Sequence, residues 1–233
     1  MRDIVIAIDG FSACGKSSTA KAVAAALGYS YIDTGAMYRA VTHHFISRYI
    51  SLDNHKAIER ALADIHIDFV YNPKKNHSET FLNGLNVEDE IRSMEVSNMV
   101  SEVSAIGAVR HALVAQQRKL GKKKRVVMDG RDIGTTVFPD AELKIFMTAD
   151  FHTRAVRRQK ELLEKDVMIG LEEVAENLKK RDVIDTTRKE SPLRKAPDAI
   201  EIDTTHLTFE EQVEEILYLA GAKMICEQKA AYI

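Results

Sequence analysis

The stretch Gly10-Phe11-Ser12-Ala13-Cys14-Gly15-Lys16-Ser17-Ser18 decides the fold of this chain, because it fits the pattern G-x-x-x-x-G-K-[ST]. Residues 4–8 before it are apolar and β-branched, which is typical of a buried parallel strand. Residues 18–27 after it are rich in Ala, Lys and Leu, which favour a helix. A phosphate-binding loop requires this order of strand, loop and helix. The alternative is a glycine turn that merely joins the two elements.

The residue types in this loop suit a nucleoside triphosphate. Gly10 and Gly15 allow the backbone to approach phosphate without a Cβ clash. The backbone N–H groups of the loop and of the first helical turn then point at one anion. Lys16 adds a positive charge for the β- and γ-phosphates, and the Ser17 hydroxyl is placed to bind Mg²⁺. Cys14 lies inside the loop, where we expect its thiol to be a spectator.

Length and composition exclude several classes of protein. The chain has 233 residues, 45% of them hydrophobic, enough for one sizeable core or a core with a small insert. Its net charge of −2 offers no general attraction for nucleic acid, and we interpret the basic run 122–125 as a solvated loop. Two cysteines, Cys14 and Cys226, can form neither a disulfide framework nor a four-ligand zinc site.

Nothing in the sequence points to a membrane or to secretion. Arg2 and Asp3 lead straight into the first predicted strand, so we expect no signal peptide, and no apolar run approaches the length of a membrane span. We therefore expect a cytoplasmic protein with no membrane partner.

Strands and helices alternate along most of the chain. Strands are predicted at residues 4–8, 29–33, 125–129, 143–147 and 199–203, with helices between them. This order predicts a P-loop NTPase-type α/β fold, a parallel five-stranded sheet flanked by helices. Ligands of such sheets bind beyond the carboxyl ends of the strands. Three predicted strands end in an aspartate, at Asp9, Asp33 and Asp129, and each of these could instead cap a helix. Asp129 resembles the carboxylate that holds Mg²⁺ through water in many P-loop proteins.

One segment departs from this alternation. Residues 67–71 alternate with period two, and Asn83-Gly84 between apolar residues predicts a hairpin. We therefore interpret 64–103 as an antiparallel insert in a core formed by 1–63 and 104–233. Helices are also predicted at the ranges 53–65, 90–120 with a break near Gly107, 151–165, 171–181 and 208–220 with Thr208 as N-cap beside Glu211. A polar stretch, 182–198, follows the helix 171–181, and a mobile lid is expected over about 154–191.

Arginine near predicted strand ends suggests what accepts the phosphoryl group. It occurs as Arg39, as Arg131, as the cluster Arg154, Arg157 and Arg158, and as Arg181 with Arg188. Each is an ordinary surface charge when taken alone, but together they suit a protein that holds two phosphorylated ligands, because arginine binds phosphate bidentately. No general base is evident, and a phosphate monoester, largely a dianion at pH 7, needs none. An alcohol acceptor such as a sugar would need a carboxylate.

These motifs make the chain similar to the bacterial cytidylate kinases, from near its start to about Ala220. Four segments carry the resemblance: 10–18, 33–39, 129–141, and 180–182 continuing through Asp185 to Arg188. The block Gly130-Arg131-Asp132-Ile133-Gly134-Thr135 is the most diagnostic of them. The resemblance implies ATP- and Mg²⁺-dependent conversion of CMP, and usually dCMP, to the diphosphate by a monomer. The insert also fits, since these enzymes are similar in having an enlarged monophosphate-binding domain.

The resemblance also implies roles for individual residues. Lys16, Arg131, Arg157, Arg181 and Arg188 would be catalytic; the loop 10–18 with Arg154, Arg157 and Arg158 would bind ATP; Ser17, and Asp129 through water, would bind Mg²⁺. For the acceptor, Thr34 and Asp129 would line its site, Arg39, Arg131 and Arg188 would hold its phosphate, Ser101, Arg110 and Asp132 would recognise cytosine, and Arg181 and Asp185 would meet the sugar.

The chain departs from the family pattern at several positions. Phe11 replaces a usual proline, and Cys14 a small residue, so we expect altered stiffness of the loop and a site open to oxidation. Thr34 replaces a frequent serine. Val183-Ile184 and Thr186-Thr187 replace a more charged, arginine-bearing stretch, which bears on the rate of transfer. The alternatives are a P-loop kinase for another small acceptor such as UMP, and a nucleotide-dependent switch, which as a GTPase would need an N-K-x-D motif that we do not find.

Overall fold

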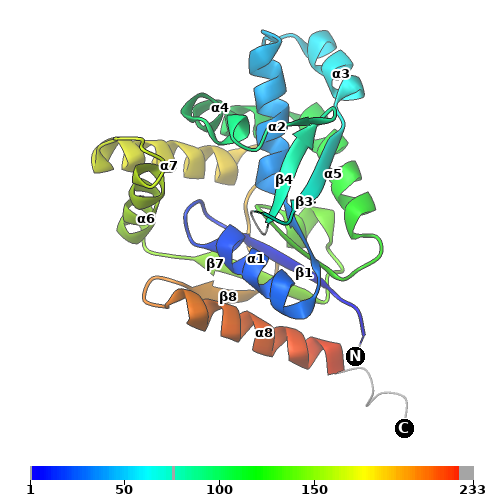
Figure 1. Ribbon diagram of the computed structural model, residues 1–233, viewed down its shortest axis with the longest axis vertical. Helices are drawn as coiled ribbons and strands as arrows, with labels where there is room; N and C mark the ends of the chain where they lie inside the picture. The colour runs from blue at the N-terminus through cyan, green and yellow to red at the C-terminus, as the bar shows by residue number, and fades with distance from the viewer. Residues whose placement is uncertain (1, 75–76, 226–233) are drawn as a thin grey trace. The chain divides into compact units, whose positions relative to one another are not determined.

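The computed structural model describes residues 2–74 and 77–225, with side chains except at His77 (Figure 1). These residues form two compact units. Among the described residues, the first unit takes in those of Met1–Ile32, Arg118–Thr187 and Ser191–Ile233, and the second those of Asp33–Gln117 and Arg188–Glu190. The expected insert, 64–103, falls within the second unit, whose bounds are wider.

The first unit is built on a five-stranded parallel sheet, which confirms the predicted fold class. Its strands are β1 (Val5–Gly10), β2 (Ser30–Asp33), β6 (Val126–Gly130), β7 (Leu143–Thr148) and β8 (Ile200–Asp203), in the order β2-β6-β1-β7-β8. The central strand β1 is buried along its whole length, as its apolar sequence predicts. Its register sets Ile8 opposite Asp129 on one side and Ile145 on the other. The ends of β1 and β6 therefore meet at one edge of the sheet.

Two helices cover one face of this sheet. α1 (Lys16–Leu27) packs against α8 (Phe209–Ile225), and both lie over a core that includes Ile4, Ile6 and Ile8. Figure 1 shows α8 running beside β8 and α1. Because side chains alternate along a strand, the neighbours of these three residues point to the opposite face. Asp9 therefore points away from the α1–α8 core.

Other elements of the first unit lie around the carboxyl ends of these strands. They are the short π-helix η2 (Ile133–Val137), α6 (Phe151–Leu163) and α7 (Leu171–Thr187). α8 begins with the predicted capping box, in which Glu211 N donates to Thr208 Oγ1 (3.2 Å) and Thr208 N donates to Glu211 Oε2 (2.8 Å). The prediction that the helix ends at residue 181 is wrong, because α7 continues six residues further. No proline interrupts this stretch, and the hydroxyls of Thr186 and Thr187 donate back to carbonyls one turn earlier.

The second unit combines a small antiparallel sheet with helices. Its strands β3 (Ile67–Asn72), β4 (His77–Leu82) and β5 (Leu85–Asn86) follow in sequence order, and its helical elements are α2 (Thr34–Ser47), α3 (His55–Asp64), η1 (Glu90–Arg92), α4 (Met94–Ala105) and α5 (Gly107–Gly121). Ile67 pairs with Leu82, and both are buried. The predicted hairpin turn is present, with φ 51° at Asn83 and 81° at Gly84. α5 begins at Gly107, where the break was predicted.

None of the helices in the described part of the chain is both long enough and apolar enough to cross a membrane.

Candidate nucleotide-binding site

The loop between β1 and α1 has the backbone that its glycines were expected to permit. Gly10 has φ 149°, and a Cβ atom at this position would lie 2.0 Å from the carbonyl oxygen of Met147. Any other residue would therefore force β7 away from the loop. α1 begins at Lys16, two residues earlier than predicted, so the N–H groups of its first turn belong to the motif itself.

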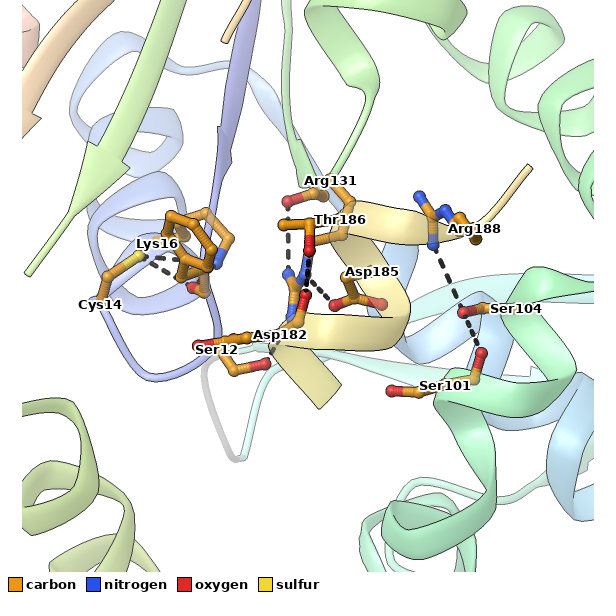
Figure 2. Close-up of polar contacts among 12 residues, drawn as sticks. Ser12, Cys14, Lys16, Ser101, Ser104, Arg131, Asp182, Asp185, Thr186 and Arg188 are labelled. Atoms are coloured by element: carbon orange, nitrogen blue, oxygen red, sulfur yellow. Dashed lines mark hydrogen bonds and ion pairs between the residues drawn. The ribbon is translucent and has the colours of Figure 1, made fainter. Parts of the chain in front are cut away.

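Lys16 is folded back onto this loop. Its ammonium group donates to the carbonyl oxygen of Phe11 and lies 3.6 Å from Cys14 Sγ (Figure 2). Burial lowers the pKa of Lys16 below its ordinary value, and the Arg131 guanidinium lowers it further. An anion at this loop would replace the carbonyl as the partner of the lysine and relieve that destabilisation of its charge.

Ser17 and Asp129 lie together, although 112 residues separate them. The Ser17 hydroxyl donates to Asp129 Oδ2 (2.8 Å), and the Tyr31 hydroxyl donates to Oδ1 (2.9 Å). A hydroxyl and a carboxylate beside a phosphate loop are hard oxygen ligands, which Mg²⁺ prefers. These residues therefore fit a magnesium ion, with Ser17 as a ligand and Asp129 as a direct or water-mediated one.

Arg131 follows β6 and reaches two partners in the first unit. Its Nε donates to Asp185 Oδ2 on α7 (2.8 Å), and its Nη2 donates to the Ser12 hydroxyl in the loop (2.6 Å; Figure 2). Burial opposes its charge, but the Asp185 carboxylate outweighs that effect and raises the pKa of Arg131. Arg131 therefore stays charged beside the phosphate loop.

Arg181 brings a second guanidinium to the same region. Its Nε is buried and has no hydrogen-bond partner among the described residues. Burial, and next the Arg131 charge, lower the pKa of Arg181 to about 10, while Asp185 opposes this shift. The Asp185 carboxylate thus acts on two arginines, by a hydrogen bond from Arg131 and electrostatically on Arg181, whose Nε stays without an acceptor among the described residues. This arrangement fits an anion with several oxygens, such as a phosphoryl group.

The three arginines of α6 have different surroundings. Arg154 pairs with Asp182 (2.8 Å) and lies over the rings of Phe11 (5.0 Å) and Phe151 (5.3 Å). Arg157 donates to the Thr204 carbonyl oxygen (2.6 Å), and Arg158 pairs with Glu161 (2.8 Å). The structure thus shows protein partners for each of them. Phe11, where the family usually has proline, makes a cation–π contact with Arg154 of this helix.

A pocket of about 360 Å³ adjoins Phe11 and Phe151, the two ring partners of Arg154 in these cation–π contacts. It is lined by Phe11, Phe151, Lys179, Asp182, Val183 and Thr186.

In the second unit, Arg39 is buried and held on two sides. Its Nη1 donates to the Ile91 carbonyl oxygen (3.2 Å) and to the Ser97 hydroxyl (2.9 Å). Thr34 begins the same helix, α2, which Asp33 caps by accepting from Ala36 N (2.8 Å). Although burial raises it, the Arg92 guanidinium lowers the pKa of Asp33, so this cap stays charged.

Ser104 links the other expected residues of the second unit. Arg110 Nη1 donates to its carbonyl oxygen (3.1 Å), and Arg188 Nη1 approaches its hydroxyl (3.4 Å). The same hydroxyl donates to the carbonyl oxygen of Ser101 (2.9 Å), as Figure 2 shows. Arg110 also lies over the ring of Tyr38 (5.3 Å). The structure therefore groups Ser101, Arg110 and Arg188 around one serine.

Sequence reasoning assigned no role to two buried residues near the phosphate loop. Thr204, after β8, donates from its hydroxyl toward the Cys14 carbonyl oxygen (2.9 Å) and accepts from Arg157 Nη1 (3.0 Å). Asp9 accepts two backbone hydrogen bonds from the loop beyond Asp132. The position of Asp9 at a strand end was the available signal, but strand ends do not reveal which loop a carboxylate meets. No sequence pattern around Thr204 indicated a role for that residue.

This chain is similar to known proteins in sequence and in fold. The family model described as Cytidylate kinase matches residues 6–222. A protein named Cytidylate kinase from Cytophaga hutchinsonii is 62% identical over 97% of this chain and 96% of its own length. One of the same name from Bacteroides fragilis is 55% identical over 93% of this chain and 96% of its own. The fold resembles a crystal structure of an uncharacterized protein from Eubacterium ventriosum, with a TM-score of 0.52 and 13% identity over 95% of this chain and 99% of that one. This chain therefore belongs to the cytidylate kinase family.

Proposed function

We propose that this protein transfers the γ-phosphoryl group of ATP to CMP, and to dCMP, giving ADP and the cytidine diphosphate. The observation that carries the proposal is the pair Arg131 and Arg181: the Asp185 carboxylate acts on both, and Arg181 Nε has no hydrogen-bond partner among the described residues. This pair adjoins a phosphate loop in a member of the cytidylate kinase family. Two guanidinium groups beside that loop suit the stabilisation of negative charge on a phosphoryl group during transfer.

The first unit is proposed to bind the donor. Backbone N–H groups of residues 10–18 surround the phosphates, and Lys16 turns from the Phe11 carbonyl oxygen to the β- and γ-phosphates. Ser17 and Asp129 would hold Mg²⁺, which when bound neutralises phosphate charge and aligns the oxygens. Arg154, Arg157 and Arg158 are proposed to bind ATP. The contact of Arg154 with Phe11 of the loop and the hydrogen bond from Arg157 to Thr204 after β8 support this proposal for two of them.

The acceptor needs no general base. The monophosphate is largely a dianion at pH 7, and one of its oxygens attacks the γ-phosphorus as the bond to the β–γ bridging oxygen breaks. We propose that Arg39, Arg131 and Arg188 hold this phosphate. Thr34, Arg181 and Asp185 are proposed to position the rest of the nucleotide. The second unit, of which 64–103 is part, is the proposed monophosphate-binding domain.

Base selection is proposed to depend on Asp132 and Arg110, with Ser101 beside Arg110. Cytosine presents an amino donor next to acceptors at N3 and O2, so Asp132 accepts from the amino group while Arg110 donates to the acceptors. Uracil presents a carbonyl to Asp132 instead. That mismatch leaves two acceptors facing each other, at a cost of about 1–3 kcal/mol.

Neither alternative has an observation in its favour. A UMP kinase would need a donor where Asp132 offers an acceptor, and a GTP-dependent switch would need an N-K-x-D motif. The test is a coupled assay of ADP release with CMP, dCMP, UMP and AMP. We expect CMP and dCMP to be phosphorylated at least about 10-fold faster than UMP, which follows from the mismatch cost. Equal rates with UMP would defeat the assignment of Asp132 and Arg110.

Closure of the segment 182–191 over bound nucleotides also stays a prediction. Its first six residues are the end of α7, so closure would move a helix end rather than a free loop. Limited proteolysis with and without both nucleotides tests it, and equal cleavage in the two conditions argues against closure. The monomeric state, which the family resemblance implies, and the cytoplasmic location stay predictions.

A further inference from the structure

We infer that Asp9 is a positioning residue, which holds the loop of Arg131 and Asp132 in the place that phosphoryl transfer and base selection need. The inference rests on the roles proposed above for these two residues. Asp9 itself is given no contact with either nucleotide.

The geometry is a two-point contact between one carboxylate and one turn of backbone. Asp9 Oδ1 accepts from Ile133 N (2.7 Å), and Asp9 Oδ2 accepts from Gly134 N (2.7 Å). These are the first two N–H groups of η2, directly after Arg131 and Asp132. Two short bonds to adjacent amides fix both the distance and the orientation of the turn, which one bond could not do.

The far end of the same loop has separate supports. Arg118 donates to the carbonyl oxygens of Thr136 (2.7 Å) and Val137 (3.1 Å), and Lys144 donates to that of Pro139. Loss of the Asp9 contact would therefore loosen the near end, which bears Arg131 and Asp132, while the far end stays attached. A functional defect without general unfolding is the expected result.

If Asp9 were only a structural hydrogen-bond acceptor, a carboxylate would be unfavourable here, because burial destabilises its charged form. Asp9 is buried, and that burial raises its pKa to about 7, against the effect of its two backbone hydrogen bonds. A neutral side chain would avoid this penalty. Asparagine has the same size, but it offers one acceptor and one donor. One of the two amides would lose its acceptor and face an NH₂ group.

The experiment compares Asp9→Asn with Arg131→Ala, Asp132→Asn and Ile216→Ala. Ile216 lies in the α1–α8 core and serves as a control for lost stability. Three quantities are measured: kcat with CMP, the ratio of kcat/KM for CMP over UMP, and amide exchange at Ile133 and Gly134. For Asp9→Asn we expect faster exchange at both amides and about a 10-fold fall in kcat and in the ratio, as for a displaced catalytic loop. Ile216→Ala keeps the ratio of the wild type.

The outcomes separate this inference from the proposed function. If Arg131→Ala lowers kcat and Asp132→Asn lowers the ratio, while Asp9→Asn changes neither, then Asp9 only fills space and the inference is overturned. If Arg131→Ala leaves kcat unchanged and Asp132→Asn leaves the ratio unchanged, the proposed roles of these residues are wrong. The inference about Asp9 is then overturned as well, because it rests on those roles. A fall in kcat alone, with an unchanged ratio, also contradicts the joint placement of both residues.

A measurement on the wild type covers the case in which Asp9→Asn does not fold. Between pH 6 and 8, the Ile133 and Gly134 amide resonances should shift together as Asp9 ionises. Asp132 and Lys16 act electrostatically on this carboxyl, and the Lys144 side chain of β7 lies beside it at Gly134. The CMP/UMP ratio should rise with the same midpoint, since phosphate ionisation is common to both substrates and cancels. A ratio that stays constant while both amides titrate, or fast exchange at both amides in the wild type, would overturn the inference.

Discussion

The Arg131 guanidinium donates to the Asp185 carboxylate across 2.8 Å, so an ion pair joins the loop after β6 to the helix α7. Asp185 is almost fully buried, and Arg181 lies in the same cluster with a lowered pKa. The Asp185 carboxylate therefore acts on both guanidinium groups. These two cations near the phosphate loop are the electrostatic feature on which the proposed transfer depends.

Arg131→Ala should lower kcat by about 100-fold or more, because the side chain is proposed to stabilise charge on the transferring group. Initial rates at saturating ATP and CMP measure this effect. Arg60→Ala removes an exposed arginine of α3 and should keep the rate of the wild type. An unchanged kcat in Arg131→Ala would remove that residue from the mechanism.

Lys16→Ala should also lower kcat by about 100-fold or more, because the loop would lose the charge proposed for the β- and γ-phosphates. The matched control is Lys21→Ala, which removes an exposed lysine from the same helix. Steady-state kinetics with varied ATP will show whether the loss is in kcat. If both variants have equal rates, the loop lysine does not take part.

Ser17→Ala should raise the Mg²⁺ concentration that gives half of the maximal rate. The substitution removes a hydroxyl that lies 2.8 Å from Asp129 and is proposed as a ligand. A titration with MgCl₂ at fixed nucleotide concentrations measures this requirement, and excess EDTA should abolish activity. Ser30→Ala, an exposed serine of β2, is the control. The same Mg²⁺ requirement in Ser17→Ala and wild type would exclude Ser17 as a ligand.

Asp9→Asn should gain stability relative to the wild type as the pH rises from about 4 to 7. The pKa of Asp9 is raised from 3.8 in the unfolded chain to about 7 in the folded one. Its neutral form therefore stabilises the fold at low pH, and this contribution is lost as the pH rises through 7. Asparagine cannot ionise, so it avoids the loss. Urea unfolding of both proteins at pH 4.5, 6 and 8 measures the difference.

The difference in the free energy of unfolding, Asp9→Asn minus wild type, should increase up to about pH 7 and then level. Other carboxylates titrate in both proteins and cancel. A difference that is constant over this range would show that Asp9 stays ionised in the folded state.

The phosphate loop, the five parallel strands and the hairpin at Asn83-Gly84 were predictable because each depends on local sequence. The backbone conformation at position 10 requires a glycine. Burial on both faces of the strand requires apolar side chains at residues 4–8. The family resemblance placed Arg131 and Asp132 in one motif for the same reason. The end of α7 was not predictable, because polar residues such as Thr186 and Thr187 favour helix and loop almost equally. The partners of the α6 arginines were not predictable either.

The sequence by itself determined that this chain has a phosphate loop on a parallel sheet, since spacing, glycine and hydrophobic pattern are properties of neighbouring residues. Only the tertiary structure decided that Asp9 binds the amides of Ile133 and Gly134, and that Arg157 meets Thr204. These pairs lie far apart in the chain. Their contact depends on strand order and register, which bring distant loops to one edge of a sheet and which no local pattern encodes.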